Sequence, residues 1–154
     1  ALTAGAALLP LLLFAERIRR HAAAALVSLG VLFAAWGINV YLVQLSPHWG
    51  QRETLLAYHA AANDEPGPIV AYQMNWKGEN FYSGNKIPTF VSSGKKFTQW
   101  IDEEKKKGVK VFYFLTEHRR ASTLSNELGT PRFFDKLTDE TLNNKFLLVR
   151  ARFE

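Results

Sequence analysis

The chain has 154 residues, a hydrophobic fraction of 47% and a formal net charge of +5. It contains no cysteine, which excludes disulfide bonds and thiolate metal sites. The basic residues are spread along the chain without an RNA-binding signature, so the charge gives no case for a nucleic-acid partner.

The first residues, 1–15, are apolar but too short for a complete membrane span. Positive charge follows this run instead of preceding it, which is the reverse of a secretory signal peptide. We therefore interpret 1–15 as a truncated transmembrane helix and 16–21 as a short loop. The loop contains three arginines, and the positive-inside rule assigns it to the cytoplasm.

The segment Ala22 to Leu45 contains no charged residue. At about 1.5 Å per residue it is long enough to cross a hydrocarbon core of roughly 30 Å. The alternative is a buried helix of a soluble protein, but such helices rarely run this far without a charge. We therefore predict a spanning helix at 22–45 that completes a transmembrane hairpin over 1–45. Residues 46–154 then lie in the periplasm or outside the cell.

Residues 46–154 carry 16 Lys/Arg and 13 Asp/Glu, a balance typical of an ordinary soluble domain. Ser46 and Pro47 form a helix-start signal. The helix that they start is expected to continue through 51–62, and the other expected helices are 92–107 and 119–128, with Ser92 or Ser93 as the cap of the first of these two. The expected strands are 69–73, 89–91, 109–115, 132–137 and 145–153, with a turn or short helix at 138–144. This alternation predicts a small three-layer α/β domain with a partly parallel sheet.

Two of these strands have contrasting patterns. The strand at 109–115 is apolar on both faces, which is typical of a central strand covered by helices on both sides. In the last strand Arg150 and Arg152 alternate with apolar residues, so one of its faces should be solvated.

Polar side chains gather after the strands at 69–73 and 109–115. Ligand sites of open α/β sheets lie just beyond the carboxyl ends of strands, so two parallel neighbours would bring these side chains to one edge. Amides, cations and aromatic rings together suit a sugar or a sugar phosphate. The alternative is an ordered loop whose Asn and Gly residues only satisfy turn geometry. The candidate binding residues are Gln73, Asn75, Trp76, Lys77, Glu79, Asn80, Tyr82, Asn85 and His118.

Catalytic motifs are weak in this sequence. It contains no nucleophile elbow, P-loop or HExxH motif, and its histidines are isolated, which gives no case for a metal site. Glu79 and Glu117 could act as a general acid–base pair only if the fold brought them together. No catalytic residue and no cofactor is assigned.

Three motifs carry a resemblance to a known family: SPHW at 46–49, QMNWKGENFYSGN at 73–85 and LNNKF at 142–146. They resemble the C-terminal end of bacterial multi-spanning glycosyltransferases of the GT-C type. These enzymes are similar to protein O-mannosyltransferases and to the lipid A aminoarabinose transferase. The resemblance extends over essentially the whole chain, and the 73–85 run is its most specific part.

The resemblance implies a multi-pass protein of the bacterial inner (plasma) membrane with its C-terminal domain in the periplasm. Its donor would be a polyprenyl-phosphate sugar and its acceptor lipid A, another glycolipid or a protein. Residues 46–154 would cap the active-site cavity, with membrane lipid and an N-terminal membrane domain as partners. The catalytic carboxylates are expected in that N-terminal part, and Lys77 is the expected contact for the donor phosphate. The alternative function is a membrane-tethered periplasmic binding or assembly domain without catalytic activity.

Overall fold

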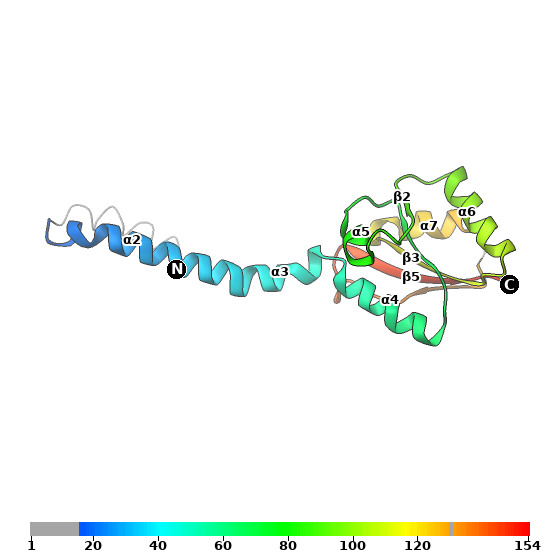
Figure 1. Cartoon of the computed structure of the whole chain (residues 1–154), viewed down its shortest axis with the longest axis horizontal. Helices are drawn as coiled ribbons and strands as arrows, with labels where there is room; N and C mark the ends of the chain where they lie inside the picture. The colour runs from blue at the N-terminus through cyan, green and yellow to red at the C-terminus, as the bar shows by residue number, and fades with distance from the viewer. Residues whose placement is uncertain (1–15, 130) are drawn as a thin grey trace. The chain divides into compact units, whose positions relative to one another are not determined.

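The structure is a computed structural model, and it describes residues 16–129 and 131–154. The chain divides into two compact units, Ala1–Gln44 and Leu45–Glu154, which are described separately (Figure 1). The truncated helix expected at 1–15 lies outside the described residues.

The N-terminal part of the described chain is helical. Helix α2 covers Glu16–Trp36, a short π-helix η1 covers Gly37–Tyr41, and helix α3 covers Leu42–Trp49. The stretch His21–Ser46 is long and apolar enough to span a membrane, and no residue of its most apolar window is buried. This exposure differs from that of a core helix in a soluble protein. The coarse expectation of a helix suited to a membrane is therefore met.

Two expectations for this region are wrong. The predicted loop at 16–21 is helical and forms the first turns of α2. Ser46 and Pro47 do not start a helix, because both lie inside α3, and the backbone N–H of Gly50 donates to the Ser46 carbonyl. The break falls after Trp49, and the next helix, α4, covers Arg52–Asp64.

The Leu45–Glu154 unit contains one mixed sheet of five strands. They are β1 Ile69–Tyr72, β2 Thr89–Phe90, β3 Val111–Glu117, β4 Phe133–Lys136 and β5 Phe146–Arg152. Their order in space is β2-β1-β3-β5-β4. Strands β2, β1 and β3 are parallel, whereas β5 is antiparallel to both β3 and β4. The predicted partly parallel sheet is therefore confirmed, with the predicted 109–115 strand near its centre.

Helices cover both faces of this sheet (Figure 1). On one face α4 contributes Leu55 to a core with Ile69, Ala71 and Tyr113. On the other face lie α6, Lys95–Lys106, and α7, Ala121–Glu127, which follows the 3₁₀ turn η2, His118–Arg120. The second core contains Phe97 and Ile101 of α6 and Leu124 of α7. Because both faces are covered, β1 and most of β3 are fully buried, which explains their continuous apolar sequence.

The helix signals of the domain were only partly correct. Helix α6 begins after Gly94 without a side-chain cap, so neither Ser92 nor Ser93 has the predicted role. The segment expected as a loop between β1 and β2 contains a short helix, α5, at Gly78–Ser83.

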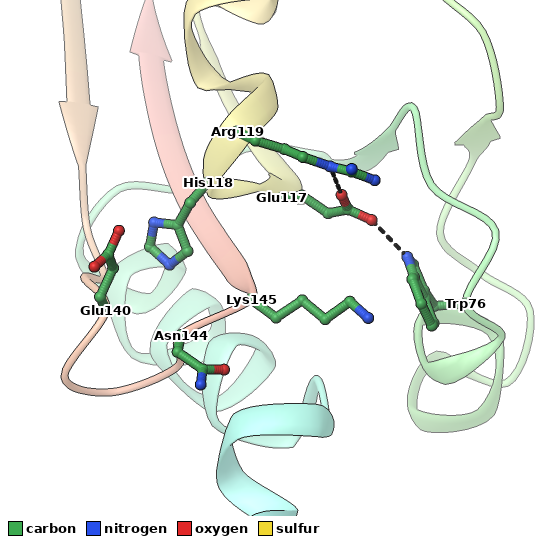
Figure 2. Close-up of a pocket in the computed structure, with 7 residues that line it drawn as sticks. All are labelled: Trp76, Glu117, His118, Arg119, Glu140, Asn144 and Lys145. Carbon is green, nitrogen blue, oxygen red and sulfur yellow. Dashed lines mark hydrogen bonds and ion pairs between the residues drawn. The ribbon is translucent and has the colours of Figure 1, made fainter.

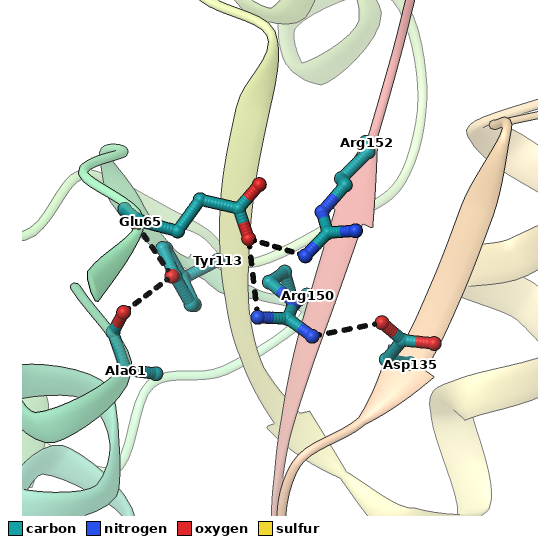
Figure 3. A network of polar contacts seen from close by, with 6 residues as sticks. All are labelled: Ala61, Glu65, Tyr113, Asp135, Arg150 and Arg152. Carbon is teal, nitrogen blue, oxygen red and sulfur yellow. Dashed lines mark hydrogen bonds and ion pairs between the residues drawn. The ribbon is translucent and has the colours of Figure 1, made fainter.

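The outward face of β5 is less solvated than predicted (Figure 3). Arg150 and Arg152 are only partly exposed, and both bind Glu65 at the end of α4, at 3.1 and 2.6 Å. Arg150 also binds Asp135 of β4 at 3.0 Å. The Tyr113 hydroxyl lies 2.7 Å from the Glu65 carbonyl oxygen. The two arginines therefore connect the end of α4 to the sheet through ion pairs. The alternation of basic and apolar residues along the strand could not indicate these partners.

Candidate functional site

The carboxyl ends of β1 and β3 lie at one edge of the sheet, because the two strands are parallel neighbours with Ala71 opposite Leu115. Strand β5 runs the other way, so its first residue, Phe146, pairs with the last residue of β3, Glu117. Three segments therefore meet at this edge: the turn after β1, the turn after β3 and the chain that enters β5. The sequence identified the first two.

Two carboxylates hold Trp76 at this edge. Glu79, which is completely buried, accepts hydrogen bonds from the backbone N–H groups of Trp76 and Lys77 at 3.1 and 3.3 Å. Glu117 accepts a hydrogen bond from the Trp76 indole Nε1 at 2.8 Å (Figure 2). Glu79 thus fixes the backbone of Trp76 while Glu117 fixes its ring. Both carboxylates position the tryptophan, and this use competes with the acid–base role considered above.

Glu117 is buried, and its carboxylate is compensated by several donors. Arg119 Nε donates to Oε2 at 2.5 Å, and Arg120 Nε lies 3.7 Å from the same oxygen. Burial by itself would raise the pKa of Glu117. The hydrogen bonds from Trp76 and Arg119 and the nearby arginine charges outweigh burial and hold the pKa below its ordinary value. Glu117 is therefore ionised at neutral pH and binds Trp76 and Arg119 in that form.

Lys145, immediately before β5, lies against aromatic rings. Its Nζ is 3.3 Å from the centroid of the Trp76 ring and 5.0 Å from that of Trp49. The side chain extends toward Trp76 in Figure 2. Within the described residues, no carboxylate lies within ion-pair distance of this ammonium group. Its positive charge is therefore available to an anion.

These groups surround an open hollow of about 630 Å³. The hollow has cations, carboxylates, an amide, an imidazole and an indole on its walls (Figure 2). Arg119 uses Nε for Glu117, and its terminal nitrogens make no bond within the described part of the chain. Two cations and several hydrogen-bonding groups thus share one open cavity. Its lining residues are Trp76, Glu117, His118, Arg119, Glu140, Asn144 and Lys145.

Asn143 holds the segment that presents Lys145. It is completely buried, and its Oδ1 accepts hydrogen bonds from the backbone N–H groups of Lys145 and Phe146 at 3.0 and 2.8 Å. Its Nδ2 donates to the carbonyl of Gly50 at 2.7 Å. The Asn143 carbonyl lies 2.7 Å from His118 Nε2. This one residue therefore connects the α3–α4 junction, the start of β5 and the turn after β3.

A second hollow, of about 310 Å³, adjoins the first and shares Trp76 with it. Lys77 and Tyr82 line this second hollow and not the first. Gln73, Lys77 and Asn85 have positive φ angles of 51°, 67° and 63°, the only such non-glycine residues in the described chain. Uncommon backbone conformations therefore concentrate in this segment, as they often do at functional sites.

The predicted site residues thus have different positions. Trp76 and His118 line the first hollow, whereas Lys77 and Tyr82 line the second. Glu79 is buried beneath the loop. The remaining predicted residues line neither hollow: Gln73, Asn75, Asn80 and Asn85.

The prediction of binding residues omitted Glu117 and Arg119, which follow the predicted 109–115 strand and line the first hollow. It also omitted Lys145, Asn144 and Glu140, which line the same hollow. A signal for two of them was present, because Asn144 and Lys145 belong to the LNNKF motif. The direction of β5 was the missing information. Only an antiparallel last strand brings its first residues to the carboxyl edge of β1 and β3.

Comparison of the chain with family models, curated proteins and solved structures finds no match. Among the described residues, no group of three His, Cys, Asp or Glu side chains could hold a metal ion.

Proposed function

We propose that the chain is the C-terminal portion of a multi-pass glycosyltransferase of the bacterial inner membrane. In this proposal residues 46–154 are periplasmic, cap the active-site cavity and bind the sugar-phosphate head of a polyprenyl-phosphate donor. The sugar then passes to a periplasmic lipid or protein acceptor. The hairpin over 1–45, the family relationship and the donor are parts of this proposal.

The observation that best supports donor binding is Lys145, an ammonium over Trp76 without a carboxylate partner within the described residues. A cation–π contact at an exposed site contributes about 0.5–1 kcal/mol. A hydrogen bond to a charged group contributes about 1.5–3 kcal/mol. A phosphate would therefore compete successfully with the indole for Lys145. Arg119 supplies a second cation, and Asn144 and Glu140 supply partners for sugar hydroxyls.

The donor can be tested on the chain in nanodiscs with a short-chain polyprenyl-phosphate sugar as the ligand. Trp76 lines the hollow, so we expect ligand to change tryptophan fluorescence. Lys145→Ala should weaken binding about ten- to hundredfold, which corresponds to 1.5–3 kcal/mol. Lys106→Ala is the matched control, because Lys106 is exposed in α6 and lines neither hollow. Equal affinity in both variants would contradict the proposal.

A second candidate function is a membrane-tethered binding or assembly domain without catalytic activity. It needs only what the Leu45–Glu154 unit itself contains: Glu117, which is buried and ion-paired and has a lowered pKa, is a poor proton donor at neutral pH, and binding requires none. Both functions include sugar-phosphate binding and differ in the reaction. Sugar transfer by a longer protein that contains this chain, reduced by Lys145→Ala, would support the transferase. Binding without transfer to any lipid or protein acceptor would support the binding domain.

A further inference from the structure

Four aromatic side chains of the Leu45–Glu154 unit are about half exposed or more around the second hollow. Trp49 ends α3, Trp76 follows β1, and Phe81 and Tyr82 belong to α5. Phe81 is 80% exposed and Trp49 is 64% exposed. Trp49, Trp76, Phe81 and Tyr82 all line the same hollow, so they form one surface, which we call the aromatic face.

Such a surface is unusual for a part of a protein that faces only water. Burying a large aromatic side chain is favourable, and clustered exposed apolar groups mark interaction surfaces. The sheet core does not lack apolar residues, since Phe97, Phe112 and Phe114 are fully buried. The exposure of the four rings therefore needs an explanation of its own.

We propose that the aromatic face of the Leu45–Glu154 unit lies in the headgroup layer of the membrane. Trp49 is three residues beyond Ser46, where the candidate span ends, and both residues belong to α3. At no more than about 3.6 Å per residue, Trp49 cannot be far from the lipid surface at that end of the span. Aromatic rings with polar edges favour this interface.

The charges beside the aromatic face also fit the headgroup layer of a membrane. Lys77 lines the second hollow, and the ammonium of Lys145 lies near the rings of Trp49 and Trp76. The described lining residues of this hollow include no acidic side chain. Cations among aromatic rings match the phosphates of lipid headgroups above an apolar layer. The proposal requires a membrane but no sugar chemistry, so it can fail independently of the proposed function.

The chain contains no cysteine, so a nitroxide can be attached at one chosen position. The test uses Phe81→Cys in the full chain, reconstituted in nanodiscs of phosphatidylethanolamine and phosphatidylglycerol. Collision with oxygen, which concentrates in lipid, is compared with collision with a water-soluble nickel chelate. If Phe81→Cys fails to fold, Tyr82→Cys replaces it as a second position on the aromatic face.

Phe133→Cys is the matched control, because Phe133 is also an exposed phenylalanine. Phe133 and Val111 both pair with Arg152, which puts Phe133 at the opposite edge of the sheet from Glu117. We expect oxygen to dominate at position 81 and the nickel chelate to dominate at position 133. Dominance of the chelate at both positions would overturn the proposal. Shielding of position 81 from both reagents would also overturn it, since a protein surface would then cover the aromatic face.

Discussion

The ammonium of Lys145 lies 3.3 Å from the centroid of the Trp76 ring, and the same ring donates its indole N–H to Glu117 at 2.8 Å. Trp76 thus separates a cation from a buried carboxylate, and each contact uses a different part of the ring. The hydrogen bond uses the edge of the indole, whereas the ammonium uses its π system. The two contacts can therefore be removed separately.

Trp76→Phe should destabilise the fold although the ring is half exposed. Phenylalanine keeps an aromatic face for Lys145 but has no donor for Glu117, whose Oε1 would lose its hydrogen bond in a buried position. An unsatisfied buried acceptor costs about 1–3 kcal/mol. We expect that loss in the unfolding free energy measured with urea. Trp49→Phe is the control, because the Trp49 indole makes no hydrogen bond to the described residues and the change should alter stability by less than about 0.5 kcal/mol. Equal effects of the two changes would argue against the role of the indole N–H.

Glu117 should make stability depend on acid pH. Its pKa is lowered in the folded protein, so its contribution is complete above the ordinary glutamate pKa of about 4.3 and decreases as pH falls through the lowered folded value. Glu117→Gln should flatten this part of the pH profile of unfolding free energy. Glu103→Gln, at an exposed position of α6, should leave the profile unchanged. A profile that keeps its full slope in Glu117→Gln would exclude this glutamate as a source of the pH dependence.

Most of the fold could be predicted from the sequence, because hydrophobic runs and glycine breaks mark the strands and helices. All five strands appear close to their predicted positions. The helix caps were harder to predict, since Gly94 occupies the cap position before α6 in place of a serine with a hydrogen-bonding side chain. Ser46 and Pro47 carry a start signal inside α3, where the preceding helical turns override it.

Only part of the candidate site could be predicted from the sequence, and the reason is different. Trp76 lies in the turn after β1 and His118 directly follows β3, so the rule for strand ends identifies them. Lys145 precedes a strand, and it reaches the same edge only because β5 is antiparallel to β3. Strand direction depends on long-range pairing, which a local pattern does not encode. Glu79, also a predicted binding residue, is buried and accepts hydrogen bonds from the backbone N–H groups of Trp76 and Lys77.

The membrane topology proposed here has a direct test. Arg17, Arg19 and Arg20 favour the cytoplasm for the start of α2, which leaves the Leu45–Glu154 unit outside. In intact cells an impermeant maleimide should label Lys95→Cys, at an exposed position, and spare Ile18→Cys until the cells are lysed. Labelling of Ile18→Cys alone before lysis would reverse the topology.

Asn143 should be the most sensitive residue of the LNNKF motif. Its side chain satisfies the carbonyl of Gly50 and the backbone N–H groups of Lys145 and Phe146. Asn143→Ala would leave these groups unpaired next to a core residue, since Phe146 is almost completely buried. With about 1–3 kcal/mol for each unsatisfied buried group, and partial access of water, we expect a loss of roughly 2–5 kcal/mol in unfolding free energy.

Two variants separate the contributions of Asn143. Asn143→Asp keeps the acceptor for Lys145 and Phe146 but puts a buried carboxylate oxygen against the Gly50 carbonyl, so its loss should be large at neutral pH and decrease in acid, where the protonated carboxyl can donate to Gly50. Asn144→Ala, at the exposed neighbouring position, should change the unfolding free energy by less than about 0.5 kcal/mol. Asn144 lines the hollow, so the same substitution should still weaken binding of a sugar phosphate. Loss of stability in Asn144→Ala equal to that in Asn143→Ala would show that the motif does not depend on the bonds of Asn143.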